Sequence, residues 1–131
     1  MRRLALFCVS FVAICCCVVA AGASTRQVQP FTSGWRFLQS DALGAQAPSF
    51  DDSSWQAVTL PHDWAIAGPI DEKNSTGPAG GFFPAGIGWY RKTFDVPVSA
   101  ATRRTFIVFG GVMANGDVWI NGQLLGHRPY G

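Results

Sequence analysis

Cysteine is absent from most of this chain. All four cysteines lie within its first segment, as Cys8, Cys15, Cys16 and Cys17. Residues 24–131 therefore offer no thiolate ligand for a metal and no partner for a disulfide. The two histidines, His62 and His127, are too few for a zinc site. We expect no metal and no cofactor, and a domain that its hydrophobic core holds together.

Glutamate is almost absent as well, since Glu72 is the only one, and it lies in a stretch rich in glycine and proline. Hydrolysis of a glycoside with retention needs two carboxyl groups about 5–5.5 Å apart. The aspartates stand mainly in turn-like sequences, where Asp caps backbone N–H groups. We therefore predict no catalytic residue in this chain.

His62-Asp63 resembles the histidine and carboxylate of a catalytic base, but no nucleophile motif accompanies the pair. Pro61 ends the apolar segment before them. We expect the imidazole and the carboxylate to satisfy backbone groups beneath Trp64.

A charge excess is also missing once the first residues are set aside. The chain has ten basic and eight acidic residues, and two of the basic ones are Arg2 and Arg3. A neutral remainder argues against a nucleic-acid partner or an anionic membrane surface, because each selects a basic face.

The first segment has the pattern of a signal peptide at residues 1–23. A basic start precedes an apolar stretch from Leu4 to Ala21, and the small residues Ala21-Gly22-Ala23 follow. The apolar stretch is also long enough for a membrane anchor. The cleavage site favours removal, so we expect no stable membrane anchor and an exported protein, periplasmic or extracellular.

The remainder, residues 24–131, predicts one all-β domain, a β-sandwich or jelly roll. Alternation places Trp35 and Phe37 on one face of a first strand. Asn121-Gly122 between β-favouring residues predicts a two-residue hairpin. Helical periodicity of useful length is absent. The predicted strands before the hairpin cover residues 34–38, 55–60, 88–96 and 104–109, the last of them apolar enough for burial between two sheets.

The long segment of residues 65–88 is crowded with glycine and proline, and loops of this length are usually functional or disordered. Trp64 and Trp89 flank it. We predict that both lie at a pocket rim, where an indole face could stack on a sugar ring. The tryptophans of the predicted strands are instead expected in the core: Trp35, Trp55 and Trp119.

Four segments in this order resemble the N-terminal sugar-binding domain of family 2 glycoside hydrolases, and most closely the β-galactosidase branch. They are Phe50-Asp51-Asp52-Ser53-Ser54-Trp55, Leu60-Pro61-His62-Asp63-Trp64, Gly88-Trp89-Tyr90-Arg91-Lys92 and Asp117-Val118-Trp119-Ile120-Asn121-Gly122-Gln123-Leu124-Leu125-Gly126. The resemblance covers residues 31–131. It implies a galactose-binding jelly-roll domain that lacks its last strands, a β-galactoside or related carbohydrate as ligand, and catalytic glutamates in downstream domains.

Asn115 and Asp117 are the polar pair of greatest interest. They follow Gly110-Gly111, and their spacing places them on one face if the stretch is extended. In the resembled family, an asparagine near this strand reaches the galactosyl pocket. The resemblance thus implies sugar contacts for Asn115 and Asp117, with capping of the bend as the alternative.

The resulting hypothesis is a non-catalytic N-terminal domain of an exported β-galactosidase-like enzyme. Family members that act on β-mannosides or β-glucuronides share this domain, and the quoted motifs favour the galactosidases. Two alternatives come from other classes. One is a free-standing carbohydrate-binding module, and the other is a structural β-sandwich of the cell envelope that binds no sugar.

Overall fold

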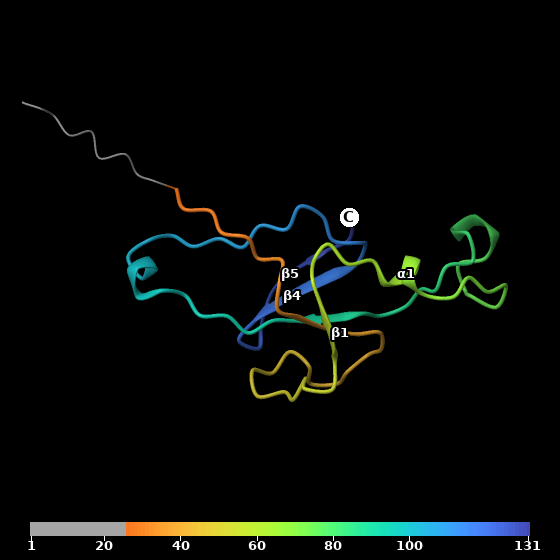
Figure 1. Ribbon diagram of the computed structural model, residues 1–131, viewed down its shortest axis with the longest axis horizontal. Helices are drawn as coiled ribbons and strands as arrows, with labels where there is room; N and C mark the ends of the chain where they lie inside the picture. Colours follow the sequence, from red (N-terminus) through yellow and green to blue (C-terminus); the bar gives the residue numbers. More distant parts are fainter. Residues whose placement is uncertain (1–25) are drawn as a thin grey trace, which may run out of the picture.

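The computed structural model describes residues 26–131, so the predicted signal peptide and all four cysteines lie outside the described residues. Short strands and long loops make up this part of the chain, with one four-residue helix (Figure 1). None of its helices has the length and apolar character needed to cross a bilayer. The prediction of an all-β fold is confirmed. The elements are β1 (Trp35–Leu38), β2 (Gln56–Val58), α1 (Trp64–Ala67), η1 (Pro78–Gly80), β3 (Trp89–Arg91), η2 (Val98–Ala100), β4 (Gly116–Ile120) and β5 (Gln123–Arg128).

A three-stranded antiparallel sheet in the order β2-β1-β3 forms the body of the fold. Trp35 and Phe37 project from one face of β1 and are 8% and 4% exposed, as the alternation predicts. Val58 of β2 completes this buried cluster. The strand predicted for residues 55–60 is shorter, and that for residues 88–96 is reduced to β3.

The hairpin predicted at Asn121-Gly122 is confirmed. Both residues adopt positive φ, +50° and +81°, as a type I′ turn requires. β4 and β5 pair through this turn, and the register shifts between Val118 and Trp119. Val118 is opposite Gly126 and Trp119 is opposite Leu124, so β5 carries one extra residue, a β-bulge that increases the local twist.

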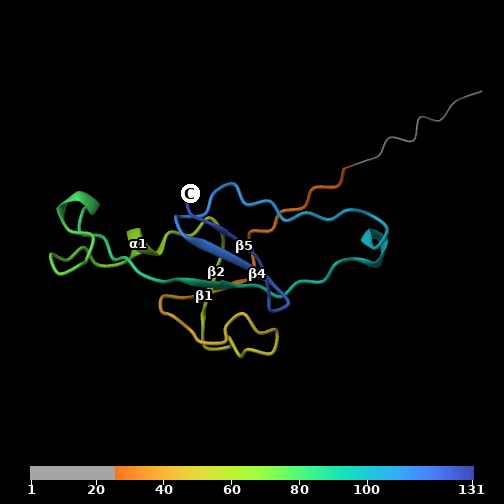
Figure 2. The same ribbon diagram turned by 180° about the vertical axis from the view of Figure 1, so that it is seen from behind.

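The indole rings of Trp89 and Trp119 join the two sheets. Their centroids are 5.3 Å apart and their planes differ by 25°. Trp35 also contacts Phe109, which ends the predicted strand 104–109, at 6.3 Å between centroids. The hairpin thus contacts the three-stranded sheet through this tryptophan pair, and the ribbon shows both in the central part of the molecule (Figures 1 and 2).

The prediction of a buried strand at residues 104–109 is wrong for the described structure. This segment belongs to no sheet, and Phe106 and Val108 are 78% and 76% exposed. It borders a wide groove of about 1240 Å³ whose other side includes residues 26–29. The apolar run has the composition of a central strand, but no described strand lies beside it to accept its backbone hydrogen bonds.

The guanidinium group of Arg91 fixes the loop between β1 and β2 to β3. Its Nε atom donates to Asp52 Oδ2 at 2.9 Å, and its terminal nitrogens donate to the carbonyl oxygens of Ala45, Ala47 and Phe50. It also lies 5.4 Å from the centroid of the Phe50 ring. This loop has no regular hydrogen-bond ladder, so one planar donor group organises it.

We predict that Arg91→Lys lowers the unfolding free energy of the protein by about 2 kcal/mol, because an ammonium group cannot reach the carboxylate and the separate carbonyls together. Chemical denaturation measures the change. Arg103→Lys is the matched control, since Arg103 is exposed and its loss should stay within about 0.5 kcal/mol. Equal effects of the two substitutions would contradict this role.

Candidate functional site

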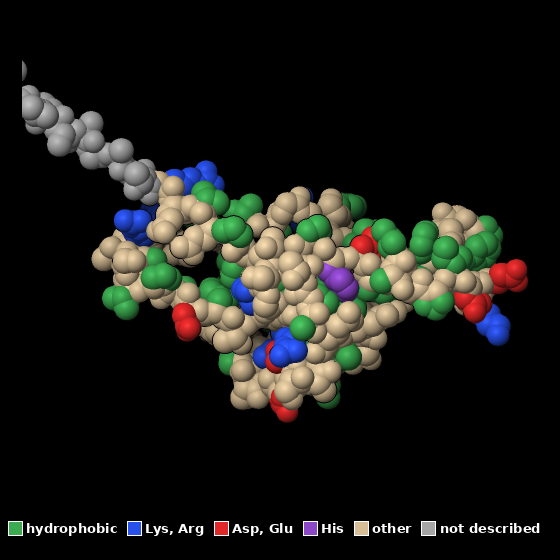
Figure 3. Space-filling view, in the orientation of Figure 1, with side chains coloured by type: hydrophobic (Ala, Val, Ile, Leu, Met, Phe, Trp, Pro, Cys, Tyr) green, Lys and Arg blue, Asp and Glu red, His purple; other side chains and the backbone are tan. Residues whose placement is uncertain are grey.

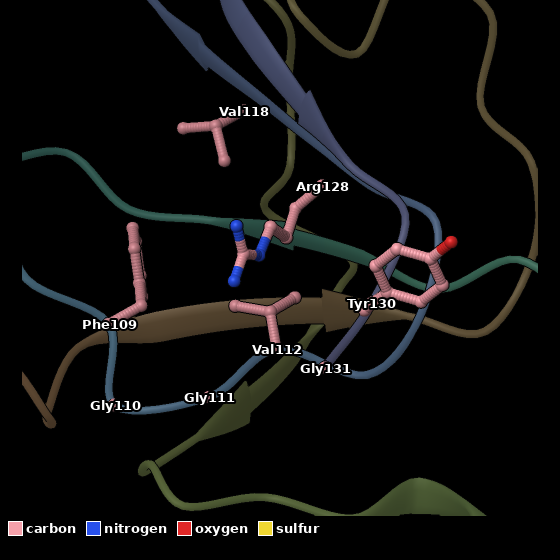
Figure 4. A pocket seen from close by; sticks show the side chains of 8 residues that line it. All are labelled: Phe109, Gly110, Gly111, Val112, Val118, Arg128, Tyr130 and Gly131. Carbon is pink, nitrogen blue, oxygen red and sulfur yellow. The ribbon is translucent and has the colours of Figure 1, made fainter.

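A shallow hollow of about 340 Å³ opens where the Gly110-Gly111 bend meets the end of β5. Figure 4 shows the side chains of Phe109, Val112 and Val118 around the guanidinium of Arg128, whereas the hydroxyl of Tyr130 points away from it. A cationic donor among apolar groups suits a small polar ligand with an apolar face. The hollow is open to solvent, and Tyr130 is 75% exposed.

Asn115 and Asp117 lie next to this hollow in the sequence but do not line it. Asn115 adopts a left-handed conformation with φ +62°, so the stretch is not extended at this residue. Asp117 is the cross-strand partner of His127, and its Oδ1 atom lies 2.7 Å from His127 Nδ1. Asn115 and Asp117 are both exposed, so a ligand can reach their side chains.

The two tryptophans predicted at a pocket rim both have aromatic neighbours. The ring of Trp64 stacks on that of Phe37, with centroids 6.3 Å apart. The ring of Trp89 stacks on Trp119, and its Nε1 atom donates to Asp41 Oδ1 at 3.2 Å. Trp64 and Trp89 are half-buried, so each keeps part of its indole surface accessible.

His62 and Tyr90 form a hydrogen bond of 2.9 Å between the imidazole Nδ1 and the phenol oxygen. The expectation that this imidazole satisfies a backbone group is wrong, because a tyrosine hydroxyl from β3 takes that place. Burial, together with the nearby Asp63 carboxylate, raises the pKa of Tyr90 above its usual value. The pair joins the turn before α1 to the sheet.

Asp63 does satisfy backbone groups, as the sequence predicts. Its Oδ1 atom accepts from the N–H groups of Ala65 and Ile66 at 3.0 and 3.3 Å, which caps α1. Asp51 likewise accepts from Ser53 N at 2.9 Å. Hydrogen bonds from the Ser53 backbone and side chain lower the pKa of the Asp51 carboxyl, the opposite of what a general acid needs at neutral pH.

Structural contacts occupy the carboxylates of six aspartates. Three cap local backbone, one accepts from the Trp89 indole, and two pair with Arg91 or His127. Glu72 is exposed on the 65–88 loop. No three His, Asp or Glu side chains gather as possible metal ligands between residues 26 and 131.

Sequence reasoning missed the roles of Arg91 and Arg128. Arg91 stands in a strand among aromatic residues, which is a weak signal that its charge has a specific partner. The partners of Arg91 lie about forty residues away in the sequence, and no local pattern connects them.

Two small antiparallel sheets, an Asn-Gly hairpin and a solvent-open hollow with a cationic donor define a small β domain. Comparison with known proteins gives the family. Residues 87–129 match the family described as the galactose-binding domain of β-galactosidase. The chain resembles the N-terminal galactose-binding domain of family 2 glycoside hydrolases.

The β-galactosidase BoGH2A of Bacteroides ovatus is 45% identical over 115 residues, which are 88% of this chain and 14% of that protein. A β-glycosidase structure from Bacteroides vulgatus matches with a TM-score of 0.75 and 46% identity, over 77% of this chain and 13% of that one. A family 2 structure from Bacteroides cellulosilyticus matches with a TM-score of 0.70 and 33% identity, over 79% of this chain and 14% of that one. Matching relatives include proteins named β-galactosidase and β-glucuronidase.

We predict that the unfolding free energy falls as the pH rises above about 10. Folding raises the pKa of Tyr90, so the unfolded chain loses this proton first. The contribution of Tyr90 to the unfolding free energy is therefore fully present below the unfolded pKa and is lost as the pH rises through the folded pKa. Tyr90→Phe should weaken this dependence and cost about 1 kcal/mol at neutral pH through the lost bond to His62.

Urea denaturation at several pH values between about 8 and 11 measures this dependence, since a tyrosine in an unfolded chain loses its proton near about pH 10. Tyr130→Phe is the matched control, because Tyr130 is exposed and makes no such bond with His62. If the unfolding free energy of Tyr90→Phe declines at alkaline pH as much as that of the unsubstituted protein, groups other than Tyr90 cause the decline.

Proposed function

We propose that this chain is the N-terminal part of an exported β-galactosidase-like enzyme, in which residues 24–131 support a catalytic domain and shape the rim of its sugar pocket. The observation that carries the proposal is the match itself. About nine-tenths of this chain aligns with BoGH2A at 45% identity, yet it spans only 14% of that protein. Export rests on the predicted signal peptide.

The contacts of the carboxylates support a non-catalytic role for residues 24–131. Five aspartates act as caps or as partners of specific donors, so they hold loops rather than meet a substrate, whereas Asp117 is exposed in its pair with His127. Chemistry on a glycoside requires a positioned acid and a nucleophile together. In this proposal, both come from polypeptide outside residues 24–131.

The complete enzyme should hydrolyse an aryl β-galactoside faster than an aryl β-glucuronide, whereas residues 24–131 alone should hydrolyse neither. Release of the aryl alcohol, followed by absorbance, measures both rates. Glu72→Gln is the control and should leave turnover of the complete enzyme unchanged. Steady turnover by residues 24–131, above all turnover that survives Glu72→Gln, would contradict the proposal, and so would a complete protein that binds galactose without turnover.

Asn115 and Asp117 are the sugar contacts we propose at this rim, with Trp64 and Trp89 beside it. Asn115→Gly removes the amide but keeps a residue that adopts φ +62° without strain. If the amide contacts the sugar, kcat/KM should fall about ten- to hundredfold, the cost of one well-placed hydrogen bond, while Tm stays unchanged. A fall in Tm at constant kcat/KM would instead assign Asn115 to the bend.

For Asp117, the matched variants are Asp117→Ala and His127→Ala, since each removes the exposed pair between these residues. Only Asp117→Ala also removes the carboxylate. A sugar contact predicts that kcat/KM falls about tenfold or more for Asp117→Ala alone. Equal effects of both variants would show that the pair, rather than a contact of Asp117 with sugar, matters.

A further inference from the structure

The hollow at the end of β5 contains one positive charge, the guanidinium of Arg128. From residue 96 to residue 131 the sequence has three arginines and a single acidic residue, Asp117. The carboxylate of Asp117 already lies 2.7 Å from His127 Nδ1. Among residues 26–131, no carboxylate forms an ion pair with Arg128. A guanidinium has five N–H donors, so Arg128 brings hydrogen-bond donors and an uncompensated charge to the hollow.

The β4-β5 hairpin places Arg128 and the Asp117 carboxylate on opposite faces. Cross-strand partners share a face of a sheet, and Arg128 is opposite Gly116. His127, one position earlier, is opposite Asp117, so this pair points to the other face. Val118 lies on the Arg128 face by alternation and lines the hollow, as Asp117 does not. The geometry of the hairpin thus keeps its own carboxylate away from the guanidinium.

Gly110 and Gly111 border the hollow, and the described residues give no packing reason for glycine at either position. Neither adopts a positive φ, and a Cβ atom at either one would meet no atom within 4 Å. Gly131, which also lines the hollow, differs, because its Cβ atom would lie 3.0 Å from the Val112 carbonyl oxygen. Glycines of the first kind leave the backbone open to the close approach of a ligand.

The other walls of the hollow are apolar and accessible. Phe109 and Val112 are 41% and 40% exposed, and Figure 4 shows both side chains beside the guanidinium. Such groups suit the C–H face of a sugar ring, and about 340 Å³ lies at the lower end of the range of ligand pockets. Figure 3 shows acidic side chains scattered toward the edges of the face in view and at the outer end of the projecting loop of residues 65–88. That face therefore has no broad acidic surface that would repel an anion.

We propose that this hollow binds a negatively charged group of a carbohydrate, a carboxylate or a sulfate, through the guanidinium of Arg128. A planar guanidinium holds such an oxyanion by two parallel N–H···O hydrogen bonds. The ring of Phe109 contacts the C–H face of the sugar, and the Gly110-Gly111 backbone lets the sugar approach. This inference rests on the proposed function, because it takes the ligand to be a carbohydrate. It adds a preference for acidic over uncharged sugars.

Equilibrium binding to the complete enzyme, measured by calorimetry, tests the preference. One pair of probes is an oligosaccharide of galacturonic acid and its uncharged methyl ester. The other pair is a sulfated galactose oligosaccharide and its desulfated form. We expect the acidic member of at least one pair to bind about tenfold more tightly than its uncharged counterpart, as a charge-assisted hydrogen bond requires. The pair that shows the preference identifies the anion. In about 1 M salt the difference should shrink, because the charge of an exposed guanidinium is then screened.

Three variants of the complete enzyme locate the effect. Arg128→Gln should abolish the preference, whereas Arg103→Gln should retain it, because Arg103 lies on the wide groove outside the hollow. Gly111→Ala adds a methyl group where the described structure has room, so Tm should stay unchanged. The added methyl group should nevertheless weaken binding of the acidic probe about tenfold, because it obstructs the approach of the sugar.

Equal affinities within both pairs would overturn the proposal, and so would a preference that Arg128→Gln and Arg103→Gln reduce equally. Full displacement of the acidic probe by an equal concentration of inorganic sulfate or acetate would assign the hollow to simple anions and overturn the carbohydrate as ligand. If Arg128→Gln fails to fold, Gly111→Ala decides, and unchanged binding by that variant would count against the site. Turnover of the aryl β-galactoside by the unsubstituted enzyme, without any preference for acidic probes, would refute this inference and leave the proposed function intact.

Discussion

The packing around Phe37 is the contact on which most of the described structure depends. Its ring contacts His62 at 4.8 Å, Tyr90 at 4.7 Å and Trp64 at 6.3 Å between centroids, and Gly88 closes over it. Phe37 lies on the central strand, His62 in the turn before α1, and Trp64 at the start of α1. Gly88 ends the long loop, and Tyr90 follows it in β3. A single buried ring on β1 thereby sets the position of a turn, a strand and both stems of the projecting loop. Its geometry of edge and tilted contacts is typical of stabilising aromatic clusters.

Hydrogen bonds between side chains and backbone groups hold much of this fold in place, where other domains rely on regular secondary structure. Arg91 organises one loop, Asn74 another, and Asp63 caps the helix beside the core. Strands are only three to six residues long, so backbone donors and acceptors of the loops need these partners. This use of polar residues has a functional consequence. Most of the carboxylates are engaged with donors of the chain itself, in keeping with the proposal that the chemistry is performed elsewhere.

Two surfaces connect this architecture with the proposed role. The first is the hollow that contains Arg128, where a hydrogen-bonding group stands next to apolar ones, and the exposed Asn115 and Asp117 follow its Gly110-Gly111 bend in the sequence. The second is the loop of residues 65–88, where Ile66, Ile70 and Ile87 are exposed. The open groove along residues 104–109 adds apolar surface that only further polypeptide or another chain could cover. A domain with surfaces of this kind fits a place inside a larger enzyme better than an isolated existence.

By itself, the sequence determined the local features whose cause is local. Alternation identified the buried face of Trp35 and Phe37, and Asn121-Gly122 specified the hairpin because few residues accept positive φ. The cap at Asp63 and the Asp51 turn follow from contacts two or three residues apart. Only the tertiary structure decided the partners of Arg91 and Tyr90, the pairing of Asp117 with His127, and the exposed state of residues 104–109. These contacts depend on which distant segments lie side by side, and an apolar run becomes a buried strand only where another strand is present to accept its hydrogen bonds.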